Sequence, residues 1–107
     1  MTDTPTPFGH FHPPREEWLA KAEPEAALEP DLPIIDTHHH LWAWGRRYQY
    51  LLQELCADAE CGHNIVATVF EECHSMYRAD GPEEMRVVGE TEFVTGIAAM
   101  SRSGFYG

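Results

Sequence analysis

The sequence predicts an α/β fold, in which strands and helices alternate along the chain. Two segments are predicted to be buried strands: residues 34–40, in which an apolar pair leads into three histidines, and residues 64–70, an unbroken apolar and largely β-branched run. Between them, residues 50–60 carry leucine and alanine at helical spacing, and a second helical pattern covers residues 83–101. The order strand, helix, strand, helix is a β-α-β unit plus one helix, and it favours a parallel sheet covered by helices.

The start of the chain is expected to form an acidic, Pro-rich N-terminal arm over residues 1–31. Residues 1–33 hold seven of the eight prolines and seven of the eighteen acidic residues. Pro13 and Pro14 are suited to open a short helix over residues 15–21, because proline is tolerated at a first helical position. A His-x-His pair at His10 and His12 has no strand to hold it, and we interpret it as incidental.

The connections between the predicted elements contain the residues typical of turns and loops. Residues 41–49 are predicted to form a loop rich in Trp, Arg and Tyr, and Gly62 is placed to end the first helix. Residues 71–82 are predicted to form a second, longer loop. Gly89 and Gly96 weaken the second helix slightly, because glycine is a poor helix former.

Length and charge limit the classes of function. A chain of 107 residues indicates one domain. A net charge of −11 argues against nucleic-acid binding, because the phosphate backbone repels an acidic surface. No apolar run reaches the ~20 residues that a membrane helix needs, and the first residues lack the pattern of a secretory signal. We therefore expect a cytoplasmic protein that binds neither nucleic acid nor membrane.

Three cysteines, Cys56, Cys61 and Cys73, are an odd number without secretory features, which favours reduced thiols. They could form a zinc knuckle with His63 or His74, but their spacing matches no short paired-ligand pattern. The alternative is that they pack as small hydrophobic side chains.

Three consecutive histidines end the first predicted strand and give the chain its most informative motif. Side chains alternate between the two faces of a strand, so Asp36, His38 and His40 are expected on one face and Thr37 and His39 on the other. Two imidazoles held two residues apart can bind one divalent metal ion, and zinc is the first candidate. Asp36 could orient a ligating imidazole or be an ordinary polar residue deeper in the fold.

Acidic and polar residues follow the second predicted strand. The carboxyl ends of parallel strands share one edge of a sheet, which would bring Glu71, Glu72 and His74 near the histidine pair. Glu71 and Glu72 are candidate catalytic carboxylates acting as general base, and His74 is a candidate substrate-binding residue. The alternative is that all three are solvated loop residues.

Three loop arginines are candidates for binding a substrate carboxylate, which arginine grips with two hydrogen bonds. These are Arg46, Arg47 and Arg78, and solvated surface charges are the alternative. Trp42 and Tyr48 could line a pocket or simply pack.

Residues 36–42, Asp-Thr-His-His-His-Leu-Trp, make the chain resemble the amidohydrolase superfamily, and more narrowly its amidohydrolase-related branch with lactonase-like and decarboxylase-like members. Residues 62–74 and 89–94 support the resemblance. It implies that residues 32–107 form the first two βα units of a (β/α)8 TIM-type barrel, with a metal at the mouth held by His38 and His40. Such a barrel takes about 250 residues, so the family's later ligands match no position here.

The resemblance implies the N-terminal part of a metal-dependent hydrolase that acts on an amide or lactone, with a small-molecule substrate and a possible homo-oligomeric state. By itself the chain is expected to be inactive. A decarboxylase on the same scaffold, a truncated non-catalytic protein and a small acidic interaction protein are the alternatives.

Overall fold

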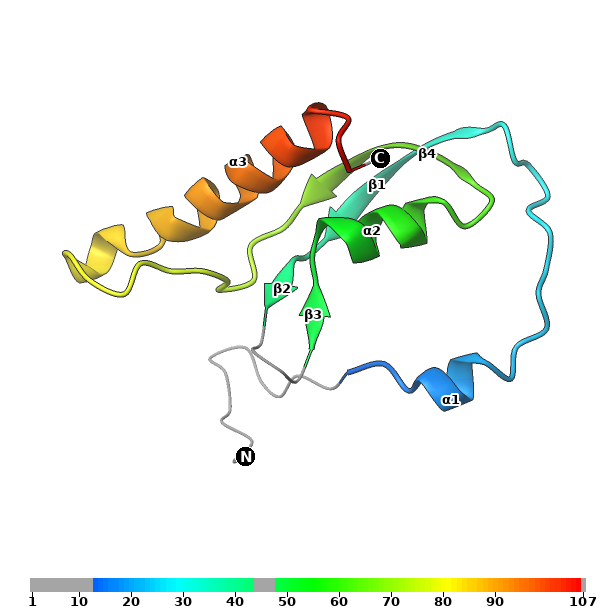
Figure 1. The fold of residues 1–107 in the computed structure, drawn as a ribbon, viewed down its shortest axis with the longest axis horizontal. Helices are drawn as coiled ribbons and strands as arrows, with labels where there is room; N and C mark the ends of the chain where they lie inside the picture. The colour runs from blue at the N-terminus through cyan, green and yellow to red at the C-terminus, as the bar shows by residue number, and fades with distance from the viewer. Residues whose placement is uncertain (1–12, 44–47, 107) are drawn as a thin grey trace.

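Two parallel strands lie at the centre of the fold (Figure 1). The computed structural model describes residues 13–43 and 48–106. Strand β1, Pro33–His39, pairs with strand β4, Asn64–Phe70, in the parallel direction. Both strands are rich in β-branched residues, which suit the pleated backbone. The sequence prediction of two parallel strands is confirmed.

A second, separate sheet follows β1 directly. Strand β2, Trp42–Ala43, pairs antiparallel with strand β3, Gln49–Tyr50, and Trp42 lies opposite Tyr50. The sequence predicted a loop here, and that prediction is wrong at both ends of the segment. Each strand is only two residues long, and their pairing brings together aromatic side chains rather than a periodic apolar pattern.

Helix α2, Leu52–Ala59, begins immediately after β3. The Glu54 carboxylate accepts a hydrogen bond of 2.9 Å from the Leu51 N–H, which satisfies a backbone donor at the start of the helix. Helix α3 spans Val88–Arg102 and is preceded by the 3₁₀ turn η1, Glu83–Met85. The predicted helix over residues 83–101 therefore exists but is divided near its start.

The N-terminal arm contains one short helix, α1, Glu16–Leu19, which is followed by residues 20–32 without a helix or strand. In Figure 1 this segment runs along the outside of the molecule to β1. No helix of the described residues is long and apolar enough to cross a membrane.

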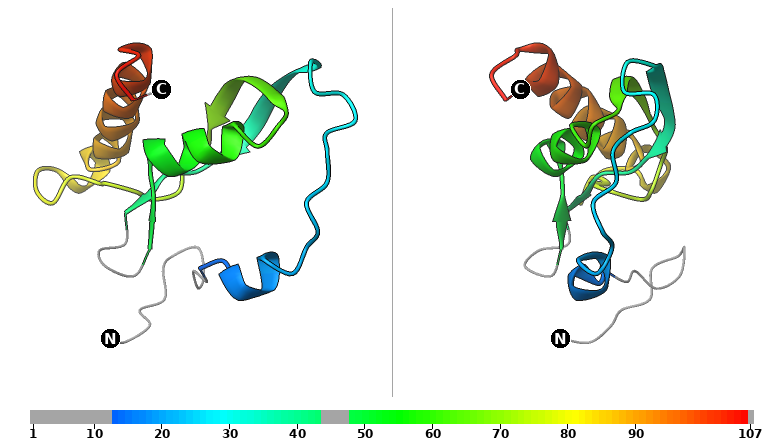
Figure 2. Two further views of the ribbon diagram at one scale, coloured as in Figure 1. Left: turned by 45° about the vertical axis from the view of Figure 1, so that its right-hand side comes forward. Right: turned by 90° about the vertical axis from the view of Figure 1, so that its right-hand side faces the viewer.

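Helices α2 and α3 lie on the same side of the β1–β4 sheet (Figure 2). The space between the helices and the sheet is lined by Leu52 and Leu55 of α2, Phe70 of β4, and Val94 and Ile97 of α3. On the sheet itself, three apolar side chains are 45–59% exposed: Ile35, Val66 and Val69. Apolar side chains of the sheet thus remain open to solvent.

The expectation of two βα units of a (β/α)8 barrel is wrong. The chain forms a small α/β domain with a two-stranded parallel sheet and a separate antiparallel pair. A barrel unit passes from a strand to a helix of the outer ring. Here the chain first forms the β2–β3 pair, and the β1–β4 ladder is irregular between Ile34 and Ile35 and again between Asp36 and His39.

Candidate metal site

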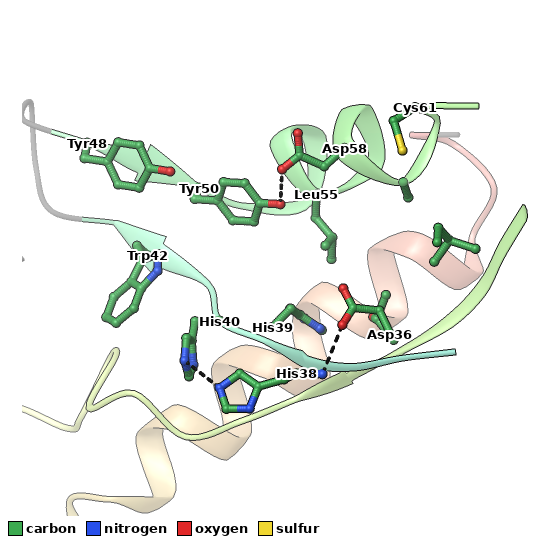
Figure 3. Close-up of a pocket in the computed structure, with 13 residues that line it drawn as sticks. Asp36, His38, His39, His40, Trp42, Tyr48, Tyr50, Leu55, Asp58 and Cys61 are labelled. Atoms are coloured by element: carbon green, nitrogen blue, oxygen red, sulfur yellow. Dashed lines mark hydrogen bonds between the residues drawn. The ribbon is translucent and has the colours of Figure 1, made fainter. Parts of the chain in front are cut away.

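The side chains of His38 and His40 converge at the carboxyl end of β1. Their Nε2 atoms are 3.2 Å apart, and the two rings meet edge to face with centroids 4.9 Å apart. Figure 3 shows the pair beside the strand, with the ring of His38 directed away from α2. His38 is exposed and His40 half-buried.

The ring of His40 is oriented by the strand next to it. Its Nδ1 lies 2.9 Å from the backbone carbonyl oxygen of Glu71, the first residue after β4. A carbonyl oxygen only accepts hydrogen bonds, so Nδ1 carries the proton and donates it. The lone pair of His40 is therefore on Nε2, the atom that faces His38. Histidine ligands of metals are commonly oriented in this way through their second nitrogen.

The separation of the two Nε2 atoms fits two ligands of one metal ion. Zinc–nitrogen bonds are about 2.0–2.1 Å long, so two imidazoles on one ion lie about 3.0 Å apart at a right angle and about 3.4 Å apart at a tetrahedral angle. The observed 3.2 Å falls within this range. Two neutral imidazole nitrogens are also a donor set that zinc and similar ions accept.

Asp36 does not share the face of the histidine pair. Figure 3 shows Asp36 and His39 directed toward α2, whereas His38 is directed away from it. The cause is the irregular register between Asp36 and His39, which interrupts the alternation of side chains along β1. The Asp36 carboxylate accepts a 3.1 Å hydrogen bond from the backbone N–H of His38. Asp36 therefore contacts the histidine motif through the backbone of His38 and not through an imidazole ring.

His39 packs toward the helices as a structural residue. Its ring meets Phe70 edge to face at 5.7 Å, and its buried Nδ1 has no hydrogen-bond partner among the described residues. Burial lowers the pKa of His39, which keeps the ring neutral inside the fold. This arrangement agrees with the sequence prediction that His39 lies apart from the pair.

The candidate catalytic carboxylates lie at the expected edge of the sheet. Glu71 follows β4 directly, and its N–H donates a 2.9 Å hydrogen bond to the His39 carbonyl, so that the parallel ladder continues past the strand. Glu71 is half-buried and Glu72 exposed. Glu71 contacts β1 through its backbone N–H and carbonyl groups. Within the described part of the chain, neither the Glu71 nor the Glu72 carboxylate forms a hydrogen bond with the two rings.

Two of the four candidate substrate-binding residues, His74 and Arg78, are described, and each contacts a side chain outside the histidine pair. The ring of His74 stacks against Tyr77 with centroids 3.9 Å apart. Arg78 forms an ion pair with Glu92 of α3, which raises the pKa of the arginine and lowers that of the glutamate. Arg46 and Arg47 lie outside the described residues.

A cavity of about 500 Å³ lies between β1, the β2–β3 pair and α2. Aromatic and acidic side chains line it, and the Tyr50 hydroxyl donates a 2.6 Å hydrogen bond to Asp58. Burial, followed by this hydrogen bond, raises the pKa of Tyr50, so the phenol stays protonated at neutral pH. Figure 3 labels Trp42 and Tyr48 among the lining residues, in agreement with the pocket-lining role that the sequence left open.

Sequence reasoning missed Glu90, a carboxylate of α3 that is only 4% exposed. Its Oε2 accepts hydrogen bonds from the backbone N–H groups of Ser75, at 2.7 Å, and Cys73, at 3.0 Å. Burial and the nearby Glu90 carboxylate raise the pKa of the Cys73 thiol to about 11. No sequence pattern separates this buried glutamate from exposed Glu92 two residues later.

Within residues 13–43 and 48–106, no group of three or more His, Cys, Asp or Glu side chains is arranged to hold a metal ion. The candidate site among these residues is therefore a pair of histidines, His38 and His40. Comparisons with protein-family models, with curated proteins and with solved structures find no match for the chain. Function is accordingly inferred from the geometry of the two histidines.

Proposed function

We propose that the chain supplies two imidazole ligands, from His38 and His40, to a divalent metal ion in the centre of a metal-dependent hydrolase acting on an amide or lactone. The observation that carries the proposal is the 3.2 Å separation of the two Nε2 atoms, with the His40 ring oriented by a backbone carbonyl. The resemblance of residues 36–42 to the amidohydrolase-related motif supports the hydrolase class, and zinc remains the first candidate ion.

The chain's own residues have separable tasks in this proposal. The Glu71 carbonyl keeps the proton of His40 on Nδ1, so His40 Nε2 presents a lone pair. In the metal-free chain His38 Nε2 donates its proton to His40 Nε2, and it would give up that proton when an ion binds both nitrogens. Glu71 and Glu72 follow β4 at the same sheet edge, where a carboxylate can accept a proton from an attacking water. A divalent ion, when bound, lowers the pKa of water and polarises a carbonyl group.

Two imidazoles leave coordination positions for water, substrate or side chains from another polypeptide segment. Catalytic zinc sites usually have three protein ligands, so the pair should bind an ion only weakly by itself. The free thiols of Cys56, Cys61 and Cys73 fit a reducing compartment, and we propose the cytoplasm.

Calorimetric titration of the chain with Zn²⁺ at about pH 7.5, above the usual pKa of histidine, tests the proposal. The double variant His38→Ala with His40→Ala should lose the binding. His63→Ala is the matched control, because His63 is an exposed histidine just before β4, at the opposite end of that strand from Glu71. Undiminished binding by the double variant would overturn the proposal and direct attention to the cysteines.

A second candidate function, a small acidic interaction protein, is favoured by the exposed apolar side chains of the sheet. Leu41 and Leu52 are the only large apolar side chains buried in the described part of the chain, while Val66 and Val69 are about half exposed. Measurement of the mass in solution against concentration tests pairing with a second copy. A rise in mass that Val66→Ser with Val69→Ser removes would support this candidate, and a monomer at all concentrations would contradict self-pairing.

A further inference from the structure

We propose that Glu90 is a positioning residue for the metal site, although it contacts neither histidine. It fixes the loop after β4, and this loop in turn orients His40 through the Glu71 carbonyl. The inference rests on the proposed function, because it assigns Glu90 a task in metal binding at His38 and His40.

The first step is the attachment of the loop to α3. Glu90 lies in the first turn of α3 and is almost completely buried, and one carboxylate oxygen accepts the N–H groups of both Cys73 and Ser75. Bonds from a backbone N–H to a charged acceptor are stronger than neutral ones. Ser75 is itself buried, so its N–H would lack a partner if the carboxylate were removed.

The second step leads from the loop to the histidines. Cys73 lies two residues after Glu71, and its Sγ lies 3.6 Å both from the carbonyl oxygen of Leu41, the residue after His40, and from Oε2 of Glu90, two acceptors that share its one weakly donating S–H. Leu41 is 1% exposed. The end of β1 and the start of the loop are therefore in contact at two places, at Glu71 and at Cys73.

The loop also needs an external attachment because its backbone is strained. His74 and Met76 have φ angles of 61° and 58°, in the left-handed region that residues with a side chain seldom adopt. Such a conformation costs about 1 kcal/mol or more per residue and persists only where surrounding contacts impose it. Glu90 supplies two of these contacts, directly beside His74.

Removal of the carboxylate should therefore let the loop relax and free the Glu71 carbonyl from its place at Nδ1 of His40. Loss of a partner that orients a ligand typically reduces metal affinity by 10–100-fold. Because Glu90 acts through one further contact, we expect a loss of about tenfold, the lower end of that range.

The experiment compares Zn²⁺ affinity by calorimetry in four variants of the full chain, each with its folded fraction measured. Glu90→Ala should lose about tenfold. Glu90→Gln keeps an oxygen for the two N–H groups and should remain within about threefold of the original chain. Glu90→Asp, shortened by one methylene, should fall between them and decides the matter if Glu90→Ala does not fold. Ile97→Ala, on the same helix but away from the loop, should lose stability without losing affinity per folded molecule.

A Glu90→Ala variant that binds zinc as tightly as Ile97→Ala at the same folded fraction would overturn the inference. The imidazole ¹⁵N spectrum of the metal-free chain provides a second readout. His40 should be a single tautomer protonated at Nδ1 in the original chain and a mixture in Glu90→Ala. If the original chain binds no zinc, the proposed function fails, and this spectrum still decides whether Glu90 positions His40.

Discussion

Gly89 and Gly96 allow one substitution to be made twice in the same helix with opposite expected results. At Gly89, the Cβ of an alanine would lie 2.4 Å from the backbone oxygen of Met76 and 2.7 Å from the backbone nitrogen of Arg78. Both distances are far below van der Waals contact, and both neighbours are backbone atoms that cannot rotate away. At Gly96 the added Cβ meets no atom within 4 Å.

The two energies follow from these contacts. Overpacking a tight contact typically costs about 1–3 kcal/mol, and the helix propensity of alanine returns at most about 1 kcal/mol. We therefore expect Gly89→Ala to reduce the free energy of unfolding by about 1–3 kcal/mol. Gly96→Ala should raise it by about 0.5–1 kcal/mol, because only the propensity changes there.

Urea denaturation followed by circular dichroism measures both variants under identical conditions. The refuting result is a pair of midpoints that shift in the same direction by the same amount, since this would mean that α3 does not approach the backbone of residues 76–78 as described.

Three further predictions concern the core, the thiols and activity. Leu41→Ala should reduce the free energy of unfolding by about 3 kcal/mol, because the Leu41 side chain is buried. Leu28→Ala, at a residue 93% exposed, should change it by less than about 0.5 kcal/mol. Equal effects of the two substitutions in urea denaturation would contradict the described core. The pKa of Cys73 is about 11, so about a thousandth of its thiol is ionised at pH 8, and iodoacetamide should alkylate it far more slowly than exposed Cys61. The alkylation rate of Cys73 should rise about tenfold per pH unit below pH 11. Equal alkylation rates of the two cysteines, measured by mass spectrometry, would argue against the burial of Cys73. The chain alone should not hydrolyse lactones or amides with added Zn²⁺ or Mn²⁺, because the described residues offer no third ligand; repeated turnover that disappears in the His38→Ala variant would contradict this.

The main strands and helices could be predicted from sequence because each has a local cause. The β-branched run at residues 64–70 coincides with β4, and the leucine spacing within residues 50–60 produces α2. The pairing of Trp42 with Tyr50 could not be predicted from sequence, because it joins two strands of only two residues each, which show no periodic pattern. The barrel prediction failed for the same reason, since it assumed that the chain passes from β1 to a helix without forming this pair.

The site was predictable only where it depends on neighbouring residues in one strand. The spacing of His38 and His40 placed them together, and their Nε2 atoms do converge. Asp36 does not lie on the expected face, because the register of β1 shifts between Asp36 and His39. No residue of the motif indicates this shift in the sequence. Glu90 acts on Ser75 across fifteen residues, and its burial results from tertiary contacts that local sequence does not encode.

Two imidazole nitrogens that share one divalent ion can be observed directly by NMR of the ¹⁵N-histidine-labelled chain with ¹¹³Cd²⁺ as the probe. Cadmium replaces zinc at nitrogen sites and couples to the nitrogen that binds it. We predict coupling to Nε2 of both His38 and His40, with Nδ1 of His40 still protonated and hydrogen-bonded to Glu71. Coupling to only one of these histidines, to His63, or to neither of the pair would contradict a shared metal site.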